Sequence, residues 1–143
     1  MNCPECGATD SLCKSRFDEC LALEFSDLRY GAVHNLTVCT YMLQHSSQLS
    51  REGWLYQRNL LREFIVDGKS PSVIRQQVKD SVDSGKRTFK FKSADGKPVI
   101  HKSTWTRTIL DVRTQDAATY CTDVTAWARS VLEESGNCST ELI

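Results

Sequence analysis

Apolar side chains recur every three or four residues along most of the chain, which is the spacing of one face of an α-helix. Two predicted starts carry capping signals: Ser50 is a good N-cap, and Ser70 followed by Pro71 suits a cap and first turn. We therefore expect a mainly α protein. The predicted helices cover residues 13–25, 32–45, 51–66, 71–83 and 115–134.

One segment departs from the helical spacing. Polar and apolar residues alternate over 87–92, and more loosely over 97–102, with Asp95 and Gly96 between the two runs. Alternation with a period of two around an Asp-Gly pair is typical of a β-hairpin. The prediction is a helical bundle with one small antiparallel β-hairpin inserted before the last helix.

The length of 143 residues suits one domain with its own core. Its 40% hydrophobic and 25% charged residues are typical of globular chains and unlike disordered ones. There is no apolar run long enough to cross a membrane, and the first residues do not form a secretory signal. We expect a single cytoplasmic domain with no membrane partner. Its predicted parts are a metal knuckle loop 1–12, helices over 13–85, a basic hairpin 86–107, and a C-terminal helix and tail 108–143.

The seven cysteines are unevenly placed, with four of them in the first twenty residues. An odd count cannot pair completely, and cytoplasmic thiols stay reduced. Cys3-Pro4-Glu5-Cys6-Gly7 has the form of a metal knuckle, in which two thiolates two residues apart can bind one ion. The pattern indicates metal ligation rather than a disulfide framework.

The two other ligands of a tetrahedral site follow from the geometry of a helical hairpin. If helices 13–25 and 32–45 are antiparallel around a turn near Arg29, Cys13 faces His45 at the end that the knuckle reaches. Cys20 lies on the same face as Cys13, but we expect it to be a small buried side chain. The predicted ligands of a structural Zn²⁺ are Cys3, Cys6, Cys13 and His45.

The same hairpin places Glu24 opposite His34. A carboxylate beside an imidazole can serve a general base or a pair of metal ligands, and it can equally be a buried pair that fixes the register of the two helices. His34 and His45 are eleven residues apart, about 16 Å along a helix, so they cannot share one metal ion. A third ligand near Glu24 would have to come from Asp111, Asp116 or Tyr120.

The chain carries equal numbers of acidic and basic residues, 18 of each, but the predicted hairpin is strongly basic. With Phe89, Phe91 and Trp105 among its basic residues, the hairpin resembles a surface that binds nucleic acid. Solvent-facing lysines on an edge strand explain the same pattern. The zero net charge of the whole chain argues against strong binding of nucleic acid. The candidate contacts are Lys86, Arg87, Lys90, Lys92 and Lys102.

Several segments together resemble a family of small bacterial proteins without an established activity. These are the CPECG knuckle of residues 3–7, the YGAVHNLTV and YMLQH runs of residues 30–38 and 41–45, and the WARSV run of residues 127–131. The family pattern has a second His where this chain has Asn35, and a His near Tyr120. The resemblance supports the choice of ligands and implies no reaction.

The sequence thus favours a zinc-stabilised helical binding or adaptor domain whose protein partner it does not identify. The first alternative is a metal-dependent enzyme centred on Glu24 and His34. The second is a nucleic-acid binder that uses the basic segment 86–107. An enzyme requires a cleft that exposes Glu24 and His34, and an adaptor requires an exposed apolar patch.

Overall fold

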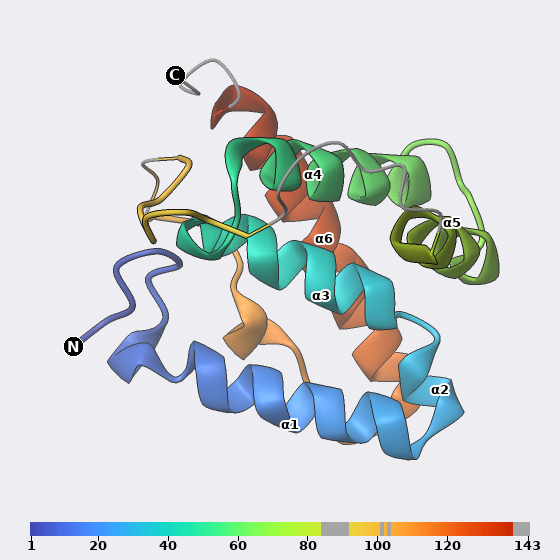
Figure 1. The fold of residues 1–143 in the computed structure, drawn as a ribbon. Coiled ribbons are helices and arrows are strands. Elements are labelled where there is room, and N and C mark those ends of the chain that lie inside the picture. The colour runs from blue at the N-terminus through green and yellow to red at the C-terminus, as the bar shows by residue number, and fades with distance from the viewer. Residues whose placement is uncertain (84–91, 101, 103, 139–143) are drawn as a thin grey trace.

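The computed structural model describes residues 1–83, 92–100, 102 and 104–138. This part of the chain is a bundle of α-helices, and a long connection separates α5 from α6 (Figure 1). No helix within it combines the length and apolar character that crossing a bilayer requires. The helices are α1 (Cys13–Ser26), α2 (Leu28–Gly31), α3 (His34–Gln44), α4 (Arg51–Ile65), α5 (Pro71–Asp83) and α6 (Ala117–Cys138).

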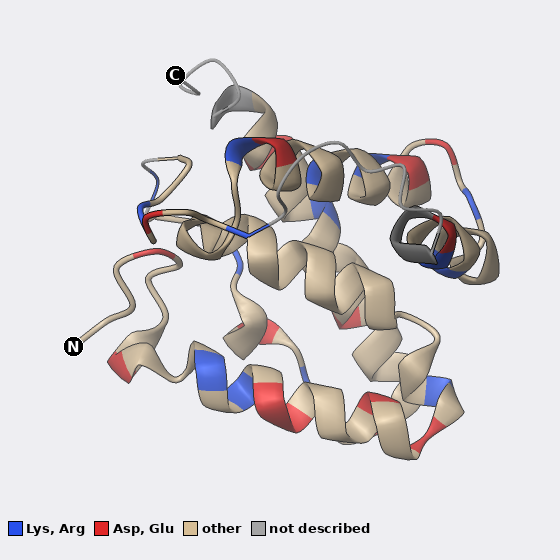
Figure 2. Ribbon diagram, viewed as in Figure 1, with Lys and Arg blue, Asp and Glu red and all other residues tan. Residues whose placement is uncertain are grey.

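The helix α3 lies at the centre of the bundle. It packs against α4 and α6, while α1 and α2 run along one side and α5 closes one end (Figure 1). No Asp, Glu, Lys or Arg occurs in α3, whose ribbon is uncharged throughout (Figure 2). Burial of an uncharged helix needs no compensating charges, which explains its central position.

The predicted helices are confirmed with boundaries that shift by a few residues. Ser50 accepts a hydrogen bond from the Gly53 N–H at 3.0 Å, as an N-cap should. The predicted turn before α3 contains the four-residue helix α2, which Asp27 begins by accepting from the Arg29 N–H at 2.9 Å. Three short 3₁₀ turns complete the connections: η1 (Thr9–Ser11), η2 (Ser46–Gln48) and η3 (Ile109–Asp111).

The C-terminal end of α3 is fixed by two buried tryptophans. Trp54 of α4 donates its indole N–H to the Leu43 carbonyl at 3.2 Å, and Trp127 of α6 donates to Gln44 Oε1 at 3.1 Å. Gln44 in turn donates to the Arg107 carbonyl at 2.7 Å. Each indole therefore fills the core without leaving its N–H unpaired. His45, the next residue, therefore follows a backbone segment that these bonds hold in place.

The described residues do not support the β-hairpin prediction. Residues 84–91, which hold most of the first predicted strand, lie outside the described part. In the second arm, the N–H groups of Val99 and Ile100 donate to Ser46 Oγ at 3.0 and 3.3 Å. The described residues contain no strand, only an isolated antiparallel bridge between Leu49 and Lys92. A side-chain hydroxyl occupies the N–H groups that a strand partner would need.

Candidate metal centre

The structure brings the four predicted metal ligands together. One ligand atom from each residue lies within 4.8 Å of the ligand atoms of the other three, and all four residues are buried. The cluster joins three separate segments, which are the knuckle loop, the first residue of α1 and the residue after α3. The ligands are Cys3, Cys6, Cys13 and His45.

The knuckle loop turns sharply at Gly7. Its φ of 80° lies in the left-handed region that glycine adopts without steric cost. The Gly7 N–H donates to the Cys3 carbonyl at 2.9 Å, and the Cys3 N–H donates to the Ala8 carbonyl at 3.0 Å. These two bonds fold the loop back on itself and turn Cys3 and Cys6 toward one point, as the CPECG motif predicts.

Glu5 ties the same loop to the far side of the cluster. Its two carboxylate oxygens accept hydrogen bonds from the Ser47 N–H at 2.9 Å and the Ser47 hydroxyl at 2.8 Å. The Glu5 carbonyl also accepts from the Trp105 indole at 3.1 Å. The knuckle is therefore positioned by protein contacts as well as by its own turn.

His45 presents a single free nitrogen. Its Nδ1 donates to the Tyr41 carbonyl at 2.7 Å, so in the neutral ring Nε2 carries the lone pair. That Nε2 is buried and has no hydrogen-bond partner in the part of the chain that the structure describes. The imidazole stacks on the Tyr41 ring at 4.0 Å, and Tyr41 stacks on Phe17 at 3.9 Å. An unpaired buried acceptor is costly unless something binds it.

The electrostatics of the cluster favour a bound cation. Burial, reinforced by repulsion from the other two thiolates, raises the pKa of Cys6 well above its ordinary value. Burial also raises the pKa of Cys13. At Cys3 hydrogen bonds from the Cys6 and Glu5 N–H groups outweigh burial and lower the pKa. Burial lowers the pKa of His45, which keeps the ring neutral. A cation between the three sulfurs would favour their ionised form, and the four residues can hold a metal ion.

The second predicted pair also forms. Glu24 of α1 is fully buried, and its Oε1 accepts from His34 Nδ1 at 2.8 Å. The other oxygen accepts from the Thr37 hydroxyl at 2.6 Å and from the Tyr120 hydroxyl. Tyr120 comes from α6, so one carboxylate joins α1, α3 and α6. Three donors stabilise the buried carboxylate.

Gly31 allows α2 to approach this pair closely. A Cβ added at Gly31 would lie 2.7 Å from the Glu24 carbonyl oxygen, a distance that real Cβ atoms do not reach. The absence of a side chain here lets the chain fold back from α1 to α3 within a few residues. The Glu24–His34 contact therefore depends on a glycine between the two helices.

In the part of the chain that the structure describes, no further His, Cys, Asp or Glu forms a ligand cluster with the Glu24–His34 pair. Among the described residues, the Cys₃His group is the one cluster of three or more His, Cys, Asp or Glu ligands. Of the three residues considered as a third ligand, Tyr120 does reach Glu24. Asp111 and Asp116 instead accept hydrogen bonds from Thr108 and Thr119 at the starts of η3 and α6.

The model of a family of unknown function, DUF5946, matches residues 1–136. The chain belongs to this family. The match confirms the predicted resemblance to a family without an established activity. No curated protein and no solved structure matches the chain. Function in this DUF5946 protein must therefore be argued from the residues themselves.

The other described cysteines of this DUF5946 member lie outside the cluster. Cys20, the rival to Cys13, is completely buried, and burial raises its pKa to about 11. Cys39 is buried and donates its thiol hydrogen to Gln57 Oε1 at 2.7 Å. Cys121 is half-buried on α6 and donates to the Arg29 carbonyl at 3.3 Å. Cys20 behaves as the small buried side chain that the sequence predicts.

The predicted nucleic-acid contacts are only partly covered by the structure. Lys86, Arg87 and Lys90 lie outside the described residues. Lys92 is exposed, and Lys102 is half-buried, with its Nζ 5.2 Å from the centre of the Trp105 ring. The described lysines form no continuous stripe beside exposed aromatic rings, because Trp105 is buried.

The residues that support the metal cluster and the Glu24–His34 pair were not predicted from the sequence. Thr37 lies one helical turn after His34 and so faces Glu24, a position that the three-residue spacing could have indicated. The stack of Phe17, Tyr41 and His45 also follows helical spacing, since Tyr41 precedes His45 by four residues. No spacing in the sequence indicates the Glu5–Ser47 hydrogen bonds, because they join a loop to a turn.

Proposed function

We propose that this DUF5946 protein is a zinc-stabilised helical domain that binds a protein partner. The observation that carries the proposal is the Cys₃His cluster, with its ligand atoms within 4.8 Å of one another and a buried, unpaired His45 Nε2. Three thiolates and one imidazole form a soft donor set that suits Zn²⁺ in tetrahedral geometry.

The zinc role that fits this geometry is structural. Four protein ligands complete a tetrahedral site, so no position is left for water or substrate, and all four residues are buried. The ion would hold the knuckle loop against the ends of α1 and α3. The Glu5–Ser47 hydrogen bonds act in the same direction by fixing the loop beside η2.

A binding role is supported by apolar side chains that the fold leaves uncovered. Phe25 at the end of α1 is 76% exposed, and Leu28 at the start of α2 is 92% exposed. Burying such side chains in a complex is favourable, at about 25 cal/mol per Å² of apolar surface. Their position at the corner between α1 and α2 supports the expectation of a protein partner.

The test is metal identity and stoichiometry in untagged protein, measured by native mass spectrometry with elemental analysis. We expect one zinc per chain, lost in Cys13→Ser. The matched control is Cys121→Ser, which removes a half-buried thiol outside the cluster and should retain zinc. Cobalt substitution of the wild-type protein provides a spectrum of thiolate ligation that does not depend on a variant's folding. Protein without any bound metal would refute the proposal.

The second candidate function is acid–base chemistry at His34. The buried Glu24 fixes the imidazole with its proton on Nδ1, which leaves Nε2 as the basic atom on a side chain that is 31% exposed. A metal-dependent version requires another ligand. A second metal per chain that is lost in Glu24→Gln would support it.

Nucleic-acid binding through segment 86–107 remains a prediction from the sequence. It requires affinity for a single-stranded oligonucleotide that falls steeply with salt and with charge reversal at Lys92 and Lys102. Binding that persists after both reversals would exclude these two lysines as contacts.

A further inference from the structure

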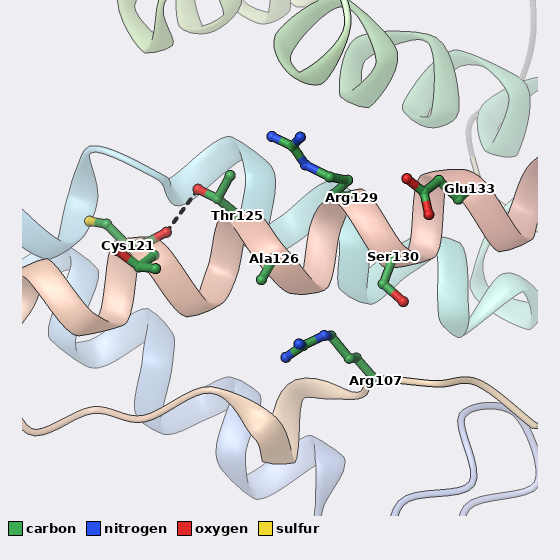
Figure 3. Close-up of a pocket in the computed structure, with 8 residues that line it drawn as sticks. Arg107, Cys121, Thr125, Ala126, Arg129, Ser130 and Glu133 are labelled. Carbon is green, nitrogen blue, oxygen red and sulfur yellow. Dashed lines mark hydrogen bonds between the residues drawn. The ribbon is translucent and has the colours of Figure 1, made fainter.

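A groove of about 640 Å³ runs along α6, and neither the four residues of the metal cluster nor Glu24 or His34 line it. Its floor consists of small or hydroxyl side chains of α6, and Arg107 borders it from the facing segment (Figure 3). The groove is open to solvent on one side. It is lined by Arg107, Cys121, Thr122, Thr125, Ala126, Arg129, Ser130 and Glu133.

The two arginines of this groove, Arg107 and Arg129, have uncommitted guanidinium groups. Neither forms a hydrogen bond or an ion pair with any residue that the structure describes. The carboxylate of Asp123, which is affected by the charge of Arg107, is already held by Arg113 Nε at 2.9 Å. By contrast, Arg29 is paired with Asp27 at 2.8 Å. The groove therefore offers two positive charges that no described carboxylate holds at ion-pair distance.

Both arginines are attached to rigid backbone. Arg129 lies within α6, and the Arg107 carbonyl accepts from the buried Gln44 at 2.7 Å. The preceding residue, Thr106, is tied to Glu134 of α6, whose carboxylate accepts from the Thr106 N–H at 3.1 Å. The two sides of the groove are thus held at a fixed separation. A binding site with fixed walls loses less entropy when it is occupied.

The groove's shape indicates the class of ligand. From Cys121 to Glu133 it spans twelve residues of helix, about 18 Å at 1.5 Å per residue. This length matches about five or six residues of extended peptide. An open groove covers one side of a ligand, whereas small-molecule sites enclose most of it.

The side chains that line the groove indicate that its ligand is charged. Guanidinium groups pair with carboxylates through two parallel hydrogen bonds, and the Ser130 and Thr122 hydroxyls can donate to backbone carbonyls. Glu133 lies at one end of the groove, so it disfavours a carboxylate there. A complementary peptide carries acidic side chains beside Arg107 and Arg129 and none beside Glu133.

We propose that this groove binds an acidic peptide segment of a protein partner. The inference rests on the proposed binding role and gives that role a place and a ligand chemistry. It needs no contribution from zinc, so the two proposals can fail separately.

The experiment is a titration of the zinc-loaded, ¹⁵N-labelled full chain with a capped hexaglutamate peptide, followed by the backbone amide resonances. We expect shifts over 121–133 and at 106–107 that weaken as salt rises, because exposed ion pairs are screened. Capped hexaglutamine, of the same length without charge, should leave these resonances unmoved.

Three variants assign the contacts. Arg107→Gln and Arg129→Gln should each weaken hexaglutamate binding by up to about fivefold, the range for one exposed ion pair. Glu133→Gln should strengthen it, because a repulsive charge is removed. The matched control is Arg75→Gln, which removes an exposed arginine of α5 that does not line the groove. The affinity of this variant for hexaglutamate should equal that of the wild-type protein.

Each other result overturns the inference. Shifts confined to lysines of 92–102, equal binding of hexaglutamine, or no shift at millimolar peptide would exclude an acidic-peptide groove. Shifts with inorganic phosphate but not with hexaglutamate would make it a small-anion site instead. Zinc content is measured on the same sample. Zinc-loaded protein that ignores the peptide overturns only this inference, and zinc-free protein overturns the proposed function.

Discussion

Glu24 Oε1 lies 2.8 Å from His34 Nδ1, and this contact joins the last turns of α1 to the first residue of α3. The same carboxylate accepts from Thr37 and from Tyr120 of α6. A single buried charge is thereby shared among three helices. Such a group stabilises the packing only while all of its partners are present.

Glu24→Ala should be among the most destabilising single changes in the protein. It leaves the Thr37 and Tyr120 hydroxyls without their acceptor and creates a cavity, for an expected loss of about 3–5 kcal/mol in the free energy of unfolding. Urea denaturation measures this loss. The control Glu52→Ala, at an exposed position in the first turn of α4, should cost less than about 1 kcal/mol. Equal losses would show that the network adds no stability.

Glu5→Ala should loosen the knuckle loop without removing a metal ligand. The Ser47 N–H and hydroxyl lose their acceptors, for an expected cost of about 1–3 kcal/mol. Hydrogen exchange of the Cys3 and Gly7 amides should become faster, and zinc should transfer sooner to a competing chelator. Glu52→Ala, an exposed change in the first turn of α4, provides the comparison. Unchanged exchange in Glu5→Ala would mean that the turn at Gly7 holds the loop by itself.

Removing zinc should release the N-terminal segment while the helices remain. A bound ion would join the loop to α1 and α3, but the tryptophan contacts at the end of α3 do not involve the four residues of the cluster. We expect a chelator to lower the thermal midpoint and to abolish protection of the Cys3 amide, with little change in far-ultraviolet circular dichroism. The chelator should have no effect on Cys13→Ser. Complete loss of helical signal would instead show that the whole fold depends on the ion.

Stability should fall in alkaline solution, in part because of Cys39. Burial raises the pKa of this thiol to about 12, whereas an unfolded thiol titrates near 8.5. Between those values the unfolded chain releases a proton that the folded chain keeps, so rising pH favours unfolding by up to about 1.4 kcal/mol per pH unit. Cys39→Ala should make the pH profile shallower above about pH 9, whatever it costs at neutral pH. Parallel profiles would contradict the burial of this thiol.

The metal cluster could be predicted from the sequence because its determinants are local. The CPECG motif fixes Cys3 and Cys6 through the turn of residues 3–7, and regular helices convert sequence separation into position. An antiparallel hairpin centred near Arg29 then places Cys13 beside His45 and Glu24 beside His34. The structure retains that register, as the Glu24–His34 contact and the Cys₃His cluster demonstrate.

The structure of the predicted β-hairpin segment could not be derived from local sequence, because alternation of polar and apolar residues does not determine which acceptor an N–H group meets. Ser46 lies more than fifty residues before Val99, and its hydroxyl accepts from Val99 and Ile100. No local pattern reports such a contact. A strand needs a partner strand along its length, whereas the Val99 and Ile100 N–H groups both donate to one long-range hydroxyl.

The sequence by itself thus determined the longer helices, the N-caps Ser50 and Ser70, the register of the first helical hairpin and the Cys₃His cluster. Tertiary structure alone decided that Tyr120 closes on Glu24, that Glu5 reaches Ser47, and that Arg107 borders the groove opposite Arg129. The physical reason is the range of the forces involved. Backbone dihedrals, caps and helical periodicity act within a few residues, whereas side chains far apart in the chain meet only after the core has packed.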